Sequence, residues 1–189
     1  MSLAALRQLM TPVRYLRIQH PAKRLLDVIV PALMAGLATA CLMLLPYPVR
    51  LLGDSGLISV FTDLLQILVG FYIAALAAVA TFDRPGMDAP LDGEPARLIE
   101  RRNGALVPVN LSRRRFLSMM FGYLSFLGLV LYFWGALAGL LAENLRDTIP
   151  VEIYVFAVPA CLFLYLFWIC NLLVTTLLGL HYLSDRIHR

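Results

Sequence analysis

Residues 58–82 have the sequence ISVFTDLLQILVGFYIAALAAVATF, in which Asp63 is the one charged side chain. A helix of about 20 apolar residues crosses the roughly 30 Å of hydrocarbon in a bilayer. In lipid, only helices and closed barrels satisfy all of their backbone polar groups. A barrel strand would alternate apolar and polar residues, and this stretch does not. We therefore predict a transmembrane helix over residues 58–82.

Three further stretches have the same character, at residues 27–46, 116–142 and 151–182. The chain of 189 residues is 60% hydrophobic and 15% charged, whereas a soluble domain carries about 25% charged residues. We predict an all-α membrane protein, a bundle of four transmembrane helices built from two helical hairpins, 27–82 and 116–183.

The arginines and lysines predict the orientation of the bundle. Of the 16 such residues, fourteen fall in the N-terminal segment, in the loop between the second and third helices, and in the C-terminal tail. The other two loops carry one each, Arg50 and Arg146. Because basic residues stay on the cytoplasmic side, we predict that both termini are cytoplasmic. The expected location is the bacterial inner membrane.

Three segments should therefore lie on the cytoplasmic side: residues 1–26, the loop 83–115, and the tail 184–189. In the first, apolar residues recur at roughly helical spacing between arginines, which predicts an amphipathic helix lying on the inner leaflet. The alternative is a helix that docks a partner. Pro12 is expected to divide this helix. The apolar positions are Leu3, Leu6, Leu9, Met10, Val13 and Leu16.

The loop 83–115 contains a signal for a β-hairpin. Asn103-Gly104 lies between two apolar-rich arms, a pattern typical of a type I′ turn. Pro108 cannot donate a ladder hydrogen bond, so its arm should be an edge strand. A two-stranded hairpin alone is marginal, so we expect it to rest on something, such as a neighbouring subunit. Ser112 is the expected cap of the third helix.

Polar residues inside the membrane are costly and are therefore candidates for function. Asp63 and Gln66 share one face of the second helix. Asp63 either reaches the interface or lines a cavity, or it pairs with an arginine of an outer loop. Asn171 and Thr175 lie deeper, on the fourth helix. Asn171 needs a partner, which predicts either a hydrogen bond to another helix or a pore or ligand site.

Small residues indicate where helices approach closely. Gly70, Ala74 and Ala78 form a line on the second helix, and Gly135 and Gly139 do so on the third. Such spacing favours close packing, within one subunit or between subunits.

Arginines cluster in the loop before the third helix. We expect these side chains to contact a cytoplasmic partner or the anionic lipids of the inner leaflet. They do not require direct binding of nucleic acid. The residues are Arg97, Arg101, Arg102, Arg113, Arg114 and Arg115.

The sequence carries no catalytic motif, and it predicts no enzyme, no bound cofactor and no metal site. The outer loops are too short to hold a domain. We therefore expect a homo-oligomeric inner-membrane protein that acts as a sensor, scaffold or pore and docks a cytosolic protein on residues 83–115. The alternative is an accessory subunit or small carrier of a transport complex. A membrane enzyme acting on lipid is a third hypothesis.

The size, the four-helix plan and the basic cytosolic loop together resemble the small four-helix membrane components of bacterial anti-phage defence systems, such as the membrane subunit of the Kiwa system. The resemblance covers the plan of the chain, and no functional residue is carried over. It implies a sensor that holds a cytosolic, nucleic-acid-binding effector at the inner face.

Overall fold

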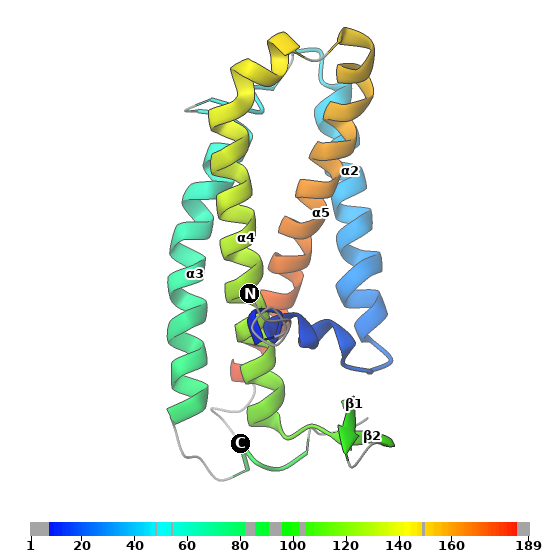
Figure 1. Cartoon of the computed structure of the whole chain (residues 1–189), viewed down its shortest axis with the longest axis vertical. Coiled ribbons are helices and arrows are strands. Elements are labelled where there is room, and N and C mark those ends of the chain that lie inside the picture. The colour runs from blue at the N-terminus through cyan, green and yellow to red at the C-terminus, as the bar shows by residue number, and fades with distance from the viewer. Residues whose placement is uncertain are drawn as a thin grey trace.

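Four long helices run along the long axis of the molecule (Figure 1). In the computed structural model they are α2 (Val30–Leu44), α3 (Leu57–Thr81), α4 (Arg113–Thr148) and α5 (Val151–Ser184). The structure describes residues 8–47, 49–53, 55–81, 86–90, 96–102, 105–148 and 150–184, without the side chains of 101–102, 142–143, 145–148, 151–152 and 154. All four helices are long and apolar enough to cross a membrane, α2 together with the turn before it. The predicted fold class is confirmed.

Two of the helices begin before the apolar stretches that predicted them. The first span begins at Leu25 instead of residue 27, in a short π-helical turn, η2 (Leu25–Ile29), that continues into α2. The third begins at Arg113, three residues before the apolar stretch, and Ser112 caps it as predicted: its Oγ accepts a 3.4 Å hydrogen bond from the Arg115 backbone N–H. Hydropathy detects only the part of a helix that lies in lipid, so polar helix ends are missed.

The helices do not pair in the order that two hairpins would give. α2 packs on α5, α3 packs on α4, and α4 packs on α5, whereas α2 and α3 make at most marginal contact. The second predicted hairpin is thus a packed pair, but the first is not. The helices pack in this order because α4 lies between α3 and α5 and contacts each of them through a different face.

Close packing of α3 on α4 depends on glycines. A Cβ on Gly135 would lie 2.8 Å from Thr62 Oγ1, and one on Gly128 would lie 2.7 Å from Val69 Cγ2. Gly135 therefore packs as predicted. Gly139 has no atom within 4 Å of an added Cβ, so it does not belong to this contact.

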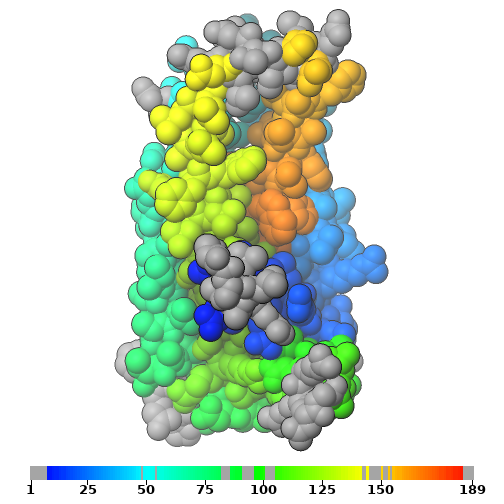
Figure 2. All heavy atoms as spheres, in the orientation of Figure 1, coloured from blue at the N-terminus to red at the C-terminus, as the bar shows by residue number. Residues whose placement is uncertain are grey.

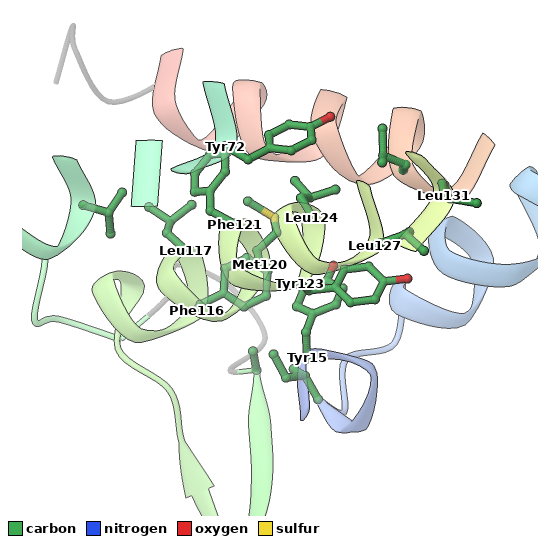
Figure 3. Close-up of a cluster of buried hydrophobic side chains, with 14 of the residues drawn as sticks. Tyr15, Tyr72, Phe116, Leu117, Met120, Phe121, Tyr123, Leu124, Leu127 and Leu131 are labelled. Carbon is green, nitrogen blue, oxygen red and sulfur yellow. The ribbon is translucent and has the colours of Figure 1, made fainter. Parts of the chain in front are cut away.

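The largest group of buried side chains surrounds the hairpin-proximal half of α4 (Figure 3). Met120, Phe121 and Leu124 are each at most 1% exposed. Gly179 of α5 leaves room for the Met120 side chain, because a Cβ at position 179 would lie 2.8 Å from Met120 Cε. The core of the protein is thus concentrated near one end of the bundle.

The N-terminal segment packs into the bundle instead of lying beside it. The 3-10 helix η1 (Pro12–Arg17) crosses the face formed by α4 and α5 (Figure 2). Tyr15 and Ile18 are 1% and 4% exposed, while Leu9 and Leu16 of the predicted apolar face are 60% and 38% exposed. The buried side chains are therefore not the ones that helical spacing selected, because the segment is a short 3-10 turn beginning at Pro12. Residues 1–7, with Leu3 and Leu6, lie outside the described residues.

The predicted β-hairpin is present between α3 and α4. β1 (Arg97–Arg102) and β2 (Ala105–Asn110) are antiparallel, with Arg102 opposite Ala105 and Ile99 opposite Pro108. The turn residues 103–104 lie outside the described residues. The hairpin contacts the N-terminal segment of its own chain, where Gln19 and Arg97 exchange backbone hydrogen bonds of 2.8 and 3.1 Å. Gln19 therefore pairs with the outer edge of β1 at its first residue, and β2 is an edge strand, as Pro108 predicted.

Candidate functional site

A pocket of about 920 Å³ opens at the hairpin end of the bundle, where the chain turns from η1 into η2. Four segments form it: the N-terminal segment, the start of the first span, β1 and α5. Its polar lining comes mainly from the residues just before the span, and its apolar lining includes two aromatic side chains of α5. The lining residues are Leu16, Ile18, Gln19, His20, Pro21, Lys23, Arg24, Asp27, Val28, Arg97, Phe167, Trp168 and Asn171.

The π-helical turn at the pocket follows from Pro31. In an α-helix, the N–H of residue 31 would bond to the carbonyl of Asp27, but proline has no N–H. The turn widens here, and the Val30 N–H bonds to the Leu25 carbonyl. The Asp27 carbonyl instead accepts a 2.7 Å hydrogen bond from Asn171 Nδ2 of α5. A proline in the first span thus creates the acceptor that ties α2 to α5.

Asn171 also accepts a hydrogen bond from α4. The Tyr123 hydroxyl donates to Asn171 Oδ1 at 2.7 Å, and Asn171 is 2% exposed. One amide thereby connects three helices near the level at which η1 crosses them. The prediction that Asn171 bonds to another helix is confirmed, and its side chain also lines the pocket. Thr175, one turn further along, is 1% exposed on the same side.

A buried ion pair lies beside this amide. Lys23 Nζ donates to the carboxylate of Asp27, one turn later in the chain, and the two side chains are 10% and 8% exposed. The ammonium also lies 3.7 Å from the centroid of the Tyr15 ring, close enough for a cation–π interaction. Burial lowers the pKa of Lys23, and the adjacent Asp27 carboxylate opposes this shift. Burial, with a smaller contribution from Asp27, raises the pKa of Tyr15.

Tyr15 fixes the N-terminal segment on α4. Its ring stacks on that of Tyr123, with centroids 5.0 Å apart and planes at 21°, and both rings lie in the cluster of Figure 3. Tyr123 lies ten residues after Arg113, so the first turns of α4 extend about 15 Å beyond this contact. These turns carry the hairpin.

Positive charge remains on the pocket after the ion pair is formed. Lys23 and Asp27 neutralise each other, whereas Arg24 and Arg97 are exposed and have no ion-pair partner among the described residues. His20 adds an imidazole ring to the same lining. The site therefore presents two guanidinium groups above an aromatic wall, an arrangement that suits an anion attached to an apolar body.

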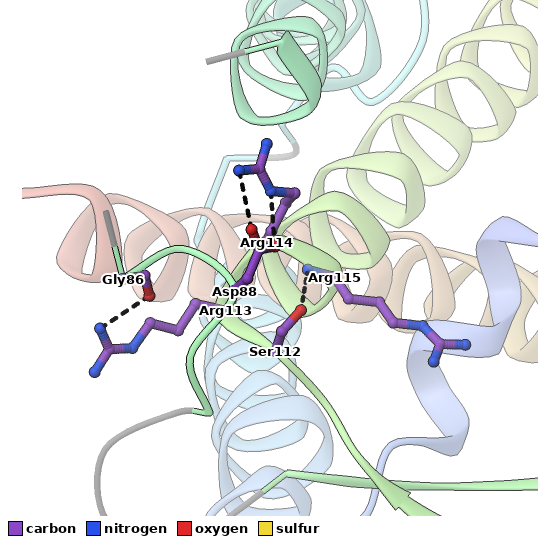
Figure 4. Close-up of polar contacts among 6 residues, drawn as sticks. All are labelled: Gly86, Asp88, Ser112, Arg113, Arg114 and Arg115. Carbon is purple, nitrogen blue, oxygen red and sulfur yellow. Dashed lines mark hydrogen bonds and ion pairs between the residues drawn. The ribbon is translucent and has the colours of Figure 1, made fainter. Parts of the chain in front are cut away.

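Three consecutive arginines at the start of α4 bond to the segment between α3 and α4, and Figure 4 shows the contacts of the first two. Arg113 Nη1 donates to the Gly86 carbonyl at 3.3 Å, and Arg114 Nε donates to Asp88 Oδ1 at 3.1 Å. Arg115 bonds to Glu100 of β1. We predicted contacts with a partner or with lipid for these side chains, but each has an acceptor within the chain.

Glu100 is shared between two arginines. Besides Arg115 of α4 it pairs with Arg14 of η1, whose Nη2 lies 3.3 Å from its Oε1. The hairpin is therefore attached to the N-terminal segment twice, through Gln19 and through Arg14, and to α4 through Arg115. The side chains of Arg101 and Arg102, which we grouped with these, lie outside the described residues.

Asp63 and Gln66 lie far from this site. Both are exposed on the outward face of α3, together with Gly70 and Ala74. No atom lies within 4 Å of a Cβ added to Gly70. The polar pair and the small residues that we treated as two features thus form one outward-facing stripe, continued by the half-buried Ala78.

Tyr15, Lys23 and Asp27 were not predicted as functional residues. Lys23 and Asp27 have the i, i+4 spacing of a helical ion pair, but Lys23 was counted only as a topology signal and Asp27 only as the start of the first apolar stretch. Among the described residues, no three His, Cys, Asp or Glu side chains are grouped so that they could hold a metal ion.

Comparisons of the chain with models of protein families, with curated proteins and with solved structures find no match.

Proposed function

We propose that this protein is a membrane scaffold or sensor that docks a cytosolic protein on its β-hairpin and acts without catalysis of its own. The observation that carries this proposal is the free edge of the hairpin. Gln19 pairs with the outer edge of β1 at Arg97, the first residue of the strand, whereas no described residue pairs with the outer edge of β2. Leu106 and Val107 on β2 are 73% and 40% exposed. Exposed strand edges are sites where a second chain can add a strand.

The register identifies the backbone groups that a partner would use. Arg97 bonds to Gln19, so it and every second residue after it direct their backbone groups away from β2. Their partners on β2 therefore face outward too, and these are Leu106, Pro108 and Asn110. Pro108, the middle position, has no N–H to offer, so we take Leu106, two residues before it, as the donor on the free edge. We propose that an extended strand of the partner pairs there.

Leu106→Pro is expected to abolish docking while the hairpin itself stays folded, because the Leu106 N–H takes no part in the β1–β2 ladder. The matched control is Leu106→Ala, which keeps the donor and removes the side chain. Proteins cross-linked in cells to the full-length chain at position 107 are the measurement. We expect at least about a tenfold loss with proline, equivalent to about 1.4 kcal/mol, and a smaller loss with alanine. Equal cross-linking by the wild type and Leu106→Pro would contradict the proposal.

The bacterial inner membrane and a cytoplasmic hairpin belong to this proposal, and the arginine distribution supports both. On the plan-level resemblance to the Kiwa membrane subunit, the docked protein would be a nucleic-acid-binding effector of anti-phage defence. The second candidate is an accessory subunit or small carrier of a transport complex. It is favoured by the pocket lined with Asp27 and Asn171, which would form the inner half of a solute path.

We also propose that the protein is a homo-oligomer and that copies meet through the stripe of Asp63, Gln66, Gly70 and Ala74. Polar side chains that face hydrocarbon are costly unless a partner satisfies them. The Gln66 amide both donates and accepts, so it can pair with the same residue of a second copy across a two-fold axis. Gly70, one turn away, allows the two backbones to approach.

Gly70→Leu is therefore expected to shift the particle toward monomer, because the added side chain separates the helices. Gly139→Leu is the control, since Gly139 is also a transmembrane glycine with no atom within 4 Å of an added Cβ. The mass of the particle is measured by light scattering in mild detergent. A wild-type monomer, or an equal effect of both substitutions, would count against this interface.

A further inference from the structure

We propose that the pocket at the hairpin end binds the phosphate headgroup of an anionic phospholipid, with Arg24 and Arg97 as its cationic contacts. This inference does not depend on the docking of a partner at β2. It rests on the position of the pocket, on the distribution of its charge, and on the apolar surface that continues from its walls along two helices.

The pocket lies where a headgroup would lie. Arg24 immediately precedes the first membrane span, which begins at Leu25, while Phe167 and Trp168 belong to the fourth span. The opening therefore straddles the boundary between hydrocarbon and water. Basic pockets at this level between transmembrane helices are typical sites for acidic lipid headgroups. Its volume of about 920 Å³ falls within the range of ligand pockets, roughly 300–1,000 Å³.

The charge of the pocket suits one phosphate. The Asp27 carboxylate lines the pocket but is 8% exposed and neutralised by Lys23, so it repels an anion only weakly. Arg24 comes from the N-terminal segment and Arg97 from β1, and both line the pocket. Guanidinium groups bind phosphate oxygens through paired hydrogen bonds.

The walls of the pocket favour a lipid over a soluble phosphate. Val28 of the first span is 49% exposed, and on the same helix Leu25 is 50% and Leu33 is 69% exposed. One turn from Phe167, the α5 residues Phe163 and Leu164 are 38% and 55% exposed. Apolar surface therefore continues from the pocket along both helices, as an acyl chain would require. A small soluble anion would leave these walls unused.

Trp168 provides a reporter inside the site. The chain has two tryptophans, so Trp134→Phe leaves Trp168 as the single emitter. The full-length protein is reconstituted in phosphatidylcholine vesicles containing a small fraction of lipid with brominated acyl chains, which quench nearby indoles. Brominated phosphatidylglycerol is expected to quench Trp168 more strongly than brominated phosphatidylcholine at the same fraction. Each arginine should account for about fivefold of the preference.

Arg24→Gln and Arg97→Gln are expected to reduce this preference separately, and Arg17→Gln is the matched control. Arg17 is exposed on the same segment and does not line the pocket. Equal quenching by the two lipids in the wild type would overturn the proposal, and so would an equal loss in Arg17→Gln and Arg24→Gln. Millimolar inorganic phosphate is added in a separate arm. If it reverses the quenching, the ligand is a soluble phosphate and the lipid assignment is wrong.

Discussion

Lys23→Met is expected to destabilise the fold by about 3–5 kcal/mol, because it leaves the Asp27 carboxylate buried without its counter-charge. Both side chains of the pair are at most 10% exposed, so water replaces the lost ammonium only poorly. Methionine keeps the length and much of the apolar volume of lysine. The effect therefore measures the loss of charge and not a packing defect beside Tyr15.

The double substitution Lys23→Met/Asp27→Leu tests whether the lost stability comes from the unpaired Asp27 charge or from a packing defect. Removing both charges is expected to restore most of the stability, since apolar residues often replace a buried ion pair at little cost. The free energy of unfolding is measured by SDS titration of the protein in bicelles, followed by circular dichroism. If the double variant is as unstable as Lys23→Met, the ion pair is not what stabilises this turn.

The four helices could be predicted because a membrane span is a local property of the sequence. Each needs an apolar stretch of sufficient length, and residues 58–82 fulfil this without reference to the rest of the chain. The hairpin could also be predicted, since Asn103-Gly104 and Pro108 restrict the backbone locally. The order in which the helices pack could not be predicted. It depends on which glycines meet which side chains, and Gly135 fits against Thr62 while Gly139 contacts nothing.

The pocket was largely missed because its residues have a second explanation in the sequence. Lys23 and Arg24 were taken as signals of orientation, and Tyr15 falls outside the apolar face that helical spacing selects. Only the folded chain brings Lys23 and Arg24 beside α5 and β1, which are more than 70 residues away in sequence, and places Tyr15 on α4. Asn171 was identified because an amide in hydrocarbon requires a partner. Nothing in the sequence identified that partner as a backbone carbonyl freed by Pro31.

Asn171→Leu is the second substitution with a large expected effect, a loss of about 2–6 kcal/mol. It leaves two buried groups without their hydrogen bonds, the Tyr123 hydroxyl and the Asp27 carbonyl. Each such group costs about 1–3 kcal/mol. Leucine is close to asparagine in size and is favourable in a membrane helix. Packing alone would therefore predict little change in the free energy of unfolding.

Pro31→Ala tests whether Asn171 is needed because Pro31 leaves the Asp27 carbonyl without a backbone donor. Alanine supplies the N–H that proline lacks, so the turn can become α-helical and satisfy the Asp27 carbonyl from within α2. Pro31 is fully buried, so its removal has a packing cost of its own, which a double-mutant cycle cancels. We expect Asn171→Leu to cost about 1 kcal/mol less when position 31 is alanine than when it is proline. Unfolding free energies that add to within about 0.3 kcal/mol would mean that the two residues are independent. In that case, the carbonyl that Pro31 leaves free would not be what requires an amide at position 171.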